Sequence, residues 1–397
     1  MRSKGVILLG CIARSYDTAA TFTDTQALEA LERVVPADLI RAAAAAAAVP
    51  TQRRRTLPAA VTLLVCIGMS LFTAHALDVV LAKMTQGMRL FWPDPEPALA
   101  TTGALSQARY RLGARPVVAL FHPVCRPLAT PQTPGAFLVG LRLLAIDGTV
   151  EDVPASPANV RAFGRQHADR GDSAFPQVQG VDRAECGTHA VIDAGFWPCH
   201  VAARVGAVRL LRRVGAGMRV FLDRGFSSCA MRERTRATGA HVRGRVPSTV
   251  TLTVRSAPCC PTAPTGYGAS ISPPDREHRK RGDHRLVRVI VYTLTDPARP
   301  GYGDTHRLIP TLLDAQEAPA LALIAAYHER WGIERTSDEI DTHQRLVRHP
   351  LRSQKPVGVI QDLSGLLIAA HRRSSPTTPC APSWPKLPPP LISPSRA

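Results

Sequence analysis

The stretch AFLVGLRLLAIDGT, residues 136–149, decides the fold class of this chain. It holds a nearly continuous apolar run of small and branched residues, which is typical of a strand buried on both faces. The run ends at Asp147. The next residue, Gly148, has no side chain and so leaves space around the backbone next to Asp147. A second run, MRVFLD (218–223), has the same pattern and ends at Asp223. The two runs predict buried strands that each end in a carboxylate.

The segments around these two runs alternate between strand and helix patterns. TVEDVP (149–154) predicts a short second strand, and THAVID (188–193) predicts another. VAARVGAVRLLRRV (201–214) has the spacing of an amphipathic helix. This alternation predicts an α/β layer.

The chain before residue 125 reads as helical and basic. Residues 21–50 show helical periodicity, residues 57–83 read as one buried helix, and residues 104–122 as another. Polar and basic side chains on the last of these helices are candidate phosphate contacts, namely Ser106, Gln107, Arg109 and Arg111.

A third informative stretch, AYHERWGIERTSDEIDTHQR (326–345), lies in a helix predicted over residues 316–346. Tyr327, Arg330 and Glu334 follow one another at offsets of three and four, so they share one helix face. The long interval between Asp223 and this helix implies an inserted subdomain at about residues 230–300. Two strand-like runs, VTLTVRS and LVRVIVYTL (286–294), predict that the insertion is mainly β.

The overall charge narrows the classes of partner. The net charge is +18, which favours nucleic acid or an anionic membrane surface. Nine cysteines without a CxxC pair indicate reduced thiols in a cytoplasmic compartment and make a sulfur-ligated metal improbable. The apolar residues 58–74 are short for a membrane span, so we expect a buried core helix there and no membrane association. The Pro/Ser-rich tail, residues 374–397, is expected to be disordered.

Asp147, Asp223 and Glu334 together form a candidate two-metal site. Phosphodiester cleavage is fastest when two divalent cations clamp the attacking and leaving oxygens. Mg²⁺ prefers oxygen ligands and retains several waters, so three carboxylates suffice, and Mn²⁺ is an alternative. Taken singly, each residue has a plainer explanation: a strand-end turn for either aspartate, an i, i+4 pair for Arg330 with Glu334, and core packing for Tyr327. Their joint occurrence on a basic chain favours the metal site.

At these residues the sequence resembles the DDE transposases of the "insertion sequence 4" family. AIDGT, FLDRGF and YHERWGIE match the three catalytic blocks of that family in order, and VPASPANVRAFGR (153–165) and ECGTHAVID (185–193) extend the match. The resemblance implies an RNase H-like catalytic domain over residues 136–373 after a helical N-terminal domain, residues 1–125. It further implies that Asp147, Asp223 and Glu334 are catalytic metal ligands. By the same resemblance, Tyr327 and Arg330 engage transposon-end DNA.

The function implied by this resemblance is cut-and-paste transposition. The protein would bind transposon ends, cleave and rejoin strands with Mg²⁺, and act on double-stranded DNA as a homodimer in a synaptic complex, associated with a bacterial nucleoid. The sequence departs from the family at Asp341, where the signature has lysine, and residues 256–285 and the tail do not resemble family sequence. The alternative is therefore an inactive, decayed transposase that retains DNA binding.

Overall fold

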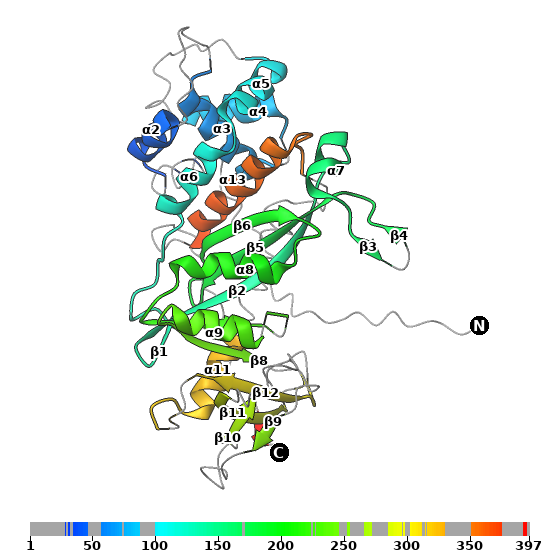
Figure 1. Ribbon diagram of the computed structural model, residues 1–397. Coiled ribbons are helices and arrows are strands. Elements are labelled where there is room, and N and C mark those ends of the chain that lie inside the picture. The colour runs from blue at the N-terminus through cyan, green and yellow to red at the C-terminus, as the bar shows by residue number, and fades with distance from the viewer. Residues whose placement is uncertain are drawn as a thin grey trace, which may run out of the picture.

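The architecture comes from a computed structural model of the 397-residue chain. Helices occupy one end of the molecule and a long, twisted mixed sheet runs away from them (Figure 1). The structure describes residues 28, 31, 35–46, 57–73, 75–87, 100–168, 171–223, 225–226, 228–245, 252–254, 266–271, 285–295, 297, 302–311, 314, 316–329, 351–374 and 392–394.

The central sheet has the strand order β6-β5-β2-β7-β8-β12-β11-β10-β9. β2 runs antiparallel to β5, and β5 antiparallel to β6, whereas β2, β7 and β8 are parallel neighbours. This mixed sheet, preceded by helices, confirms the predicted α/β class with an RNase H-like core. The core strands are β2 (Leu141–Asp152), β5 (Gln177–Glu185), β6 (Val191–Pro198), β7 (Met218–Leu222) and β8 (His241–Arg245).

The strand boundaries differ from the sequence prediction at two places. Asp147 does not end its strand, and residues 149–154 do not form a separate one, because β2 continues without a break to Asp152. The predicted strand over residues 188–193 is replaced by β6, which begins at Val191 after a turn. The whole of β5 escapes the sequence prediction, since its buried positions include Asp182, Arg183 and Glu185. A strand with charged residues at buried positions has no apolar pattern to detect.

The sheet continues into the β-rich segment. β12 (Thr305–Pro310) pairs with β8, and β11 pairs with β12, β10 and β13. The insertion therefore extends the same sheet. β13 falls inside the tail that composition predicts to be disordered, so the prediction of disorder is wrong for the three residues of this strand. The remaining strands are β1 (Phe137–Leu138), β3 (His167–Ala168), β4 (Gly171–Asp172), β9 (Leu252–Val254), β10 (Gly266–Ile271), β11 (Arg285–Leu294) and β13 (Ile392–Pro394).

The two faces of the core sheet are covered differently. Ile146, Val220 and Leu222 pack with α8 (Ala203–Leu210) and α9 (Cys229–Ala237). Trp197 of β6 and Val181 of β5 lie against Gly206 of α8, where a Cβ would come within 2.8 Å of Val181, so only glycine allows this approach. Leu143, Ala145 and Phe221, which alternate with the first set, join the helical end of the molecule on the other face.

The long helices predicted near the N-terminus are each divided in two. The apolar run over 57–83 forms α3 (Ala59–Leu71) and α4 (Leu77–Gly87), and the 104–122 segment forms α5 (Thr102–Leu112) and α6 (Arg115–Val124). Gly113 ends α5 with φ of 74°, a backbone conformation that favours glycine. Within the part of the chain that is described, no helix is both long and apolar enough to span a bilayer.

A helix from late in the sequence completes the helical end. α13 (Pro356–Ser374) packs against α3 and α6, and Gly365 of α13 lies so close to α3 that a Cβ would come within 2.8 Å of the Cys66 carbonyl oxygen. One hydrophobic cluster thus joins helices from both ends of the sequence. The domain division near residue 125 stays a prediction, but the core is continuous across it. Two further helices are α2 (Ala37–Ala46) and α7 (Pro157–Phe163).

Candidate active site

The parallel pairing of β2 with β7 sets the positions of the two predicted catalytic aspartates. In the ladder Ile146 pairs with Leu222 as the last partners, so Asp147 and Asp223 are the next residue on each strand. Neighbouring strands lie about 4.8 Å apart. The two backbones therefore bring these carboxylates side by side at the carboxyl end of the parallel ladder, as the sequence predicts.

The alternation of side chains places both aspartates on the same face of the sheet. Ala145 and Phe221, two residues before them, belong to the cluster on the face opposite α8 and α9. Because side chains alternate between the two faces along a strand, Asp147 and Asp223 point to that same face. Asp147 Oδ1 also accepts a hydrogen bond from the Gly148 amide at 2.9 Å, which orients the carboxylate.

The helix that leads to the third carboxylate packs on this same face. α11 (Ala320–Glu329) buries Leu323, Ile324 and Tyr327 against β11 and β12. The Tyr327 ring lies edge-on to Phe221 with centroids 6.4 Å apart, and Phe221 is two residues before Asp223. This contact ties α11 to the strand that leads to Asp223.

Tyr327 itself is 2% exposed. The Arg243 guanidinium of β8 lies 5.6 Å from the Tyr327 ring centroid and donates to the Leu323 carbonyl of α11. Burial is the dominant influence on the Arg243 side chain and lowers its pKa to about 9. Sequence reasoning missed Arg243, since nothing in HVRGR (241–245) distinguishes a buried arginine from a surface one. The contact of Tyr327 with DNA stays a prediction, and its packing indicates that it anchors α11.

The rest of the predicted site lies outside the described residues, which stop at Glu329 and resume at residue 351. Arg330, Glu334 and Asp341 all fall in that interval, so the geometry tests neither the third metal ligand nor the predicted phosphate contact. Among the residues that are described, no three His, Cys, Asp or Glu side chains are grouped to hold a metal ion. The donor chemistry of Asp147 and Asp223 nevertheless fits a hard cation such as Mg²⁺.

Asp182 is a neighbour that the sequence did not single out. It lies opposite Asp147 in the antiparallel ladder of β2 and β5, and paired residues point to the same face. The side chain is largely buried. Only the pairing of β5, which has no apolar pattern, brings Asp182 to this place, so no sequence signal could have found it.

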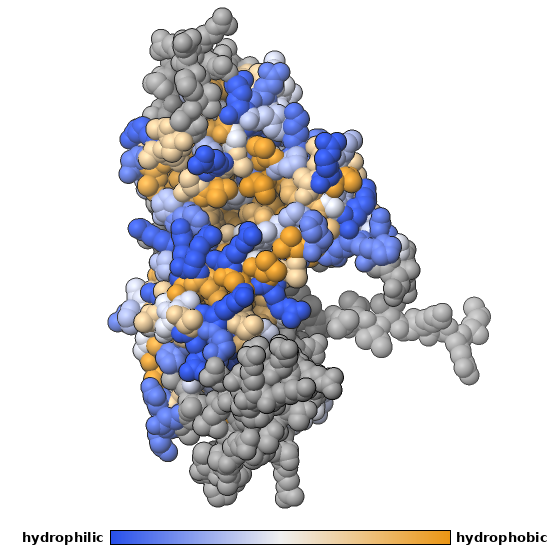
Figure 2. Space-filling model, in the orientation of Figure 1, coloured by the Kyte–Doolittle hydropathy of each residue, from blue (hydrophilic) through white to orange (hydrophobic). Residues whose placement is uncertain are grey.

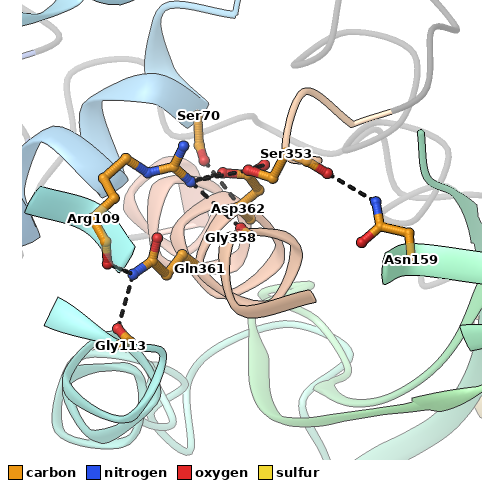
Figure 3. A network of polar contacts seen from close by, with 8 residues as sticks. All are labelled: Ser70, Arg109, Gly113, Asn159, Ser353, Gly358, Gln361 and Asp362. Carbon is orange, nitrogen blue, oxygen red and sulfur yellow. Dashed lines mark hydrogen bonds and ion pairs between the residues drawn. The ribbon is translucent and has the colours of Figure 1, made fainter. Parts of the chain in front are cut away.

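Arg109, one of the candidate phosphate contacts, has a structural role instead. Its guanidinium is buried and pairs with Asp362 of α13 at 2.5 Å, and it also donates to Ser353 Oγ at 3.1 Å (Figure 3). Gln361 of α13 donates to the carbonyls of Arg109 and Gly113, each at 2.8 Å. The prediction for Arg109 was wrong, because α13 covers that face of α5. Gln107 and Arg111 are exposed and Ser106 is half-buried.

Two family models and one known transposase match the regions described above. A family model described as "Transposase DDE domain" matches residues 140–370, and one described as "Insertion element 4 transposase N-terminal" matches residues 25–122. Transposase InsG for insertion sequence element IS4 of Escherichia coli (strain K12) is 28% identical over 348 residues, covering 84% of this chain and 72% of InsG.

Among solved structures, the chain is similar to the piggyBac transposase in a cryo-EM synaptic complex with hairpin DNA. The TM-score is 0.44 at 12% identity, covering 88% of this chain and 74% of that one. The DDE-domain match alone spans more than half of the chain and includes the positions of Asp147, Asp223 and Glu334. Because the N-terminal match precedes it in the family's order, the chain belongs to the insertion sequence 4 family of DDE transposases.

Proposed function

We propose that this transposase binds transposon ends and performs metal-dependent strand cleavage and strand transfer. The observation that carries the proposal is the placement of Asp147 and Asp223 side by side at the end of the β2–β7 ladder. Two adjacent carboxylates on one face are the donor arrangement that a pair of Mg²⁺ ions requires. Asp147 and Asp223 are proposed as two of the metal ligands, and Glu334 is proposed as the third.

The proposed roles follow from position and chemistry. Asp147, which lies on β2 between β5 and β7, would hold the cations together with Asp223 and Glu334. Bound Mg²⁺ or Mn²⁺ would supply Lewis-acid stabilisation of the phosphodiester oxygens. The Gly148 amide keeps the Asp147 carboxylate oriented, and the Phe221–Tyr327 contact holds α11 against the strand that leads to Asp223. Arg330 would contact a DNA phosphate rather than a base.

The partners proposed are double-stranded DNA, both transposon end and target, and a second copy of the chain in the synaptic complex. The net charge of +18 supports a polyanionic partner. Localisation with the bacterial nucleoid would follow from that DNA binding.

The test is cleavage of DNA that contains the gene with its natural flanking sequence. We expect nicks at both element ends in Mg²⁺ or Mn²⁺, and none when a chelator removes the metal. Sequencing of the cleaved ends locates the cuts, and products joined to a second DNA molecule report strand transfer. Cleavage that persists without divalent metal would contradict the proposal.

The second candidate function, DNA binding without catalysis, is favoured by Asp341. Where the family signature has lysine, this carboxylate would repel a passing phosphate. We expect Asp341→Lys to tighten binding of element-end DNA, most strongly at low ionic strength, because salt screens the interaction. Binding isotherms at several salt concentrations, together with the cleavage assay, measure both effects.

The two candidate functions predict different results for that variant. Tighter binding with faster cleavage indicates an active transposase whose DNA binding and cleavage are weakened only by the residue at position 341. Tighter binding without any metal-dependent nicking indicates the inactive, DNA-binding protein. Unchanged affinity at low salt would mean that position 341 does not face DNA.

A further inference from the structure

A basic cluster lies on the sheet face opposite the candidate active site. Asp193 of β6 is fully buried and is approached by basic side chains from three other elements. Arg183 of β5 approaches it at 3.4 Å, and Arg212 of the short helix η1 (Leu211–Arg213) approaches it at 3.8 Å. His122 of α6 lies 3.9 Å away. We call Arg183, Arg212, Arg213, His122 and Asp193 the arginine cluster.

The register of the sheet separates this cluster from the catalytic aspartates. Arg183 pairs with Ile146 and with Asp193, and Ile146 faces α8. Asp147, the next residue on β2, faces the other way. A ligand of the arginine cluster would therefore not compete for the candidate metal site.

The positive charge of the cluster exceeds what its carboxylate can neutralise. Two guanidinium groups approach a single aspartate, and a third, that of Arg213, has its Nη1 2.8 Å from His122 Nδ1. Burial, followed by the charges of Arg213 and then Arg212, lowers the pKa of His122, with only Asp193 acting in the opposite direction. The histidine is consequently neutral near pH 7 and does not add to the excess.

Arg183 is a buried member of the cluster with unused hydrogen-bonding capacity. It is 3% exposed, and its Nε and Nη1 have no hydrogen-bond partner among the described residues. Leaving such N–H groups buried and unpaired is unfavourable. Arg212 and Arg213, in contrast, are exposed and open the cluster to solvent. Figure 2 shows hydrophilic side chains gathered over α8 on the side nearer to α6.

We propose that the arginine cluster is a binding site for the phosphate backbone of duplex DNA. Guanidinium groups match phosphate oxygens in paired hydrogen bonds. A phosphodiester anion would accept N–H groups of the exposed Arg212 and Arg213 and offset the excess charge, to which the buried Arg183 contributes. The cluster includes side chains from α6, at the helical end, and from η1, the short helix that follows α8. Bound DNA would therefore contact both of these elements. The inference rests on the proposed DNA-binding function and adds a second contact surface to it.

The experiment uses the full chain and a random-sequence duplex, with a chelator present so that cleavage plays no part. Affinity is measured over a range of salt concentrations. Each phosphate contact contributes a slope of about 0.9 to the dependence of log K on log salt. The double variant Arg212→Ala/Arg213→Ala is expected to lower the slope by about one to two units. Because the contacts are to phosphate, the loss is the same on an element-end duplex.

The matched control is Arg234→Ala/Arg236→Ala, which removes the same charge from exposed positions in the last turn of α9. We expect this control to change the slope by less than half a unit. Equal slopes for both double variants would overturn the inference, since general charge alone would then explain binding. A wild-type slope for the cluster variant would also overturn it while leaving the proposed function intact. If the wild-type protein binds neither duplex at any salt concentration, the proposed function fails instead.

A second readout separates a phosphate site from a purely structural ion pair. The groups that face His122 are Arg183, Asp193, Arg212 and Arg213. A bound phosphate would oppose the two exposed arginines, so the pKa of His122 measured by NMR is expected to rise when duplex DNA is added. Inorganic phosphate at matched ionic strength shows whether a free anion suffices. A pKa that does not respond to DNA would count against the site.

Discussion

Asp147→Asn and Asp223→Asn are each expected to reduce metal-dependent DNA cleavage by about a thousandfold or more. The amide keeps the size and one oxygen of the side chain but removes the negative charge that attracts a divalent cation. Loss of metal-assisted stabilisation is worth several kcal/mol, and each 1.36 kcal/mol is a factor of ten in rate. Single-turnover cleavage of element-end DNA, with Mg²⁺ varied, gives both the rate and the metal dependence.

A matched control lies on the same strand. Asp152 ends β2, is exposed, and accepts a hydrogen bond from Gln177 at 2.9 Å. Asp152→Asn makes the same chemical change away from the parallel ladder and is expected to cleave at the wild-type rate. DNA binding in a chelator should be unaltered in all three variants. If Asp147→Asn cleaves as fast as Asp152→Asn, the assignment of Asp147 is wrong.

Arg109→Met is expected to lower the free energy of unfolding by about 3–5 kcal/mol. The substitution leaves Asp362 buried without its ion-pair partner, and Ser353 Oγ, 2.6 Å from Asp362, then remains its only side-chain hydrogen-bond donor among the residues described. Burial already raises the pKa of Asp362, with the Arg109 charge acting against that rise. Urea unfolding followed by circular dichroism measures the loss.

The double variant Arg109→Met/Asp362→Leu separates charge from packing. Removing both charges leaves no uncompensated ion, so much of the lost stability should return. Arg111→Met, two residues along α5 at an exposed position, is the control and is expected to stay within about 0.5 kcal/mol of wild type. If Arg109→Met lowers the free energy of unfolding by less than about 1 kcal/mol, water reaches the Arg109–Asp362 pair.

The sequence was most informative where burial and hydrophobicity coincide. The apolar runs before Asp147 and Asp223 form the paired parts of β2 and β7, and this parallel pairing places the two carboxylates next to each other. β5 could not be found because charged residues occupy several of its buried positions, and distant partners satisfy some of these residues. Glu185, for example, is fully buried and accepts hydrogen bonds from the Leu128 and Ala129 amides and pairs with Arg142.

Side-chain environment was the least predictable property of the site. Arg109 and Arg111 look equivalent in the sequence, yet one is buried under α13 and the other is exposed. The apolar run over residues 57–83 predicted a single helix, but hydrophobicity alone does not reveal the turn between α3 and α4. Tyr327 similarly looks available for DNA, and only its packing against Phe221 reveals its burial.

The position of α13 has a consequence for how the protein forms during translation. The buried surfaces of α3 and α6 are completed by a helix that the ribosome makes more than two hundred residues later. At about 5–20 residues per second, the earlier helices would wait for roughly tens of seconds with apolar surface uncovered. A nascent chain should therefore depend on chaperones during this interval. A product terminated before Pro356 should aggregate or be degraded, so that only completed molecules accumulate.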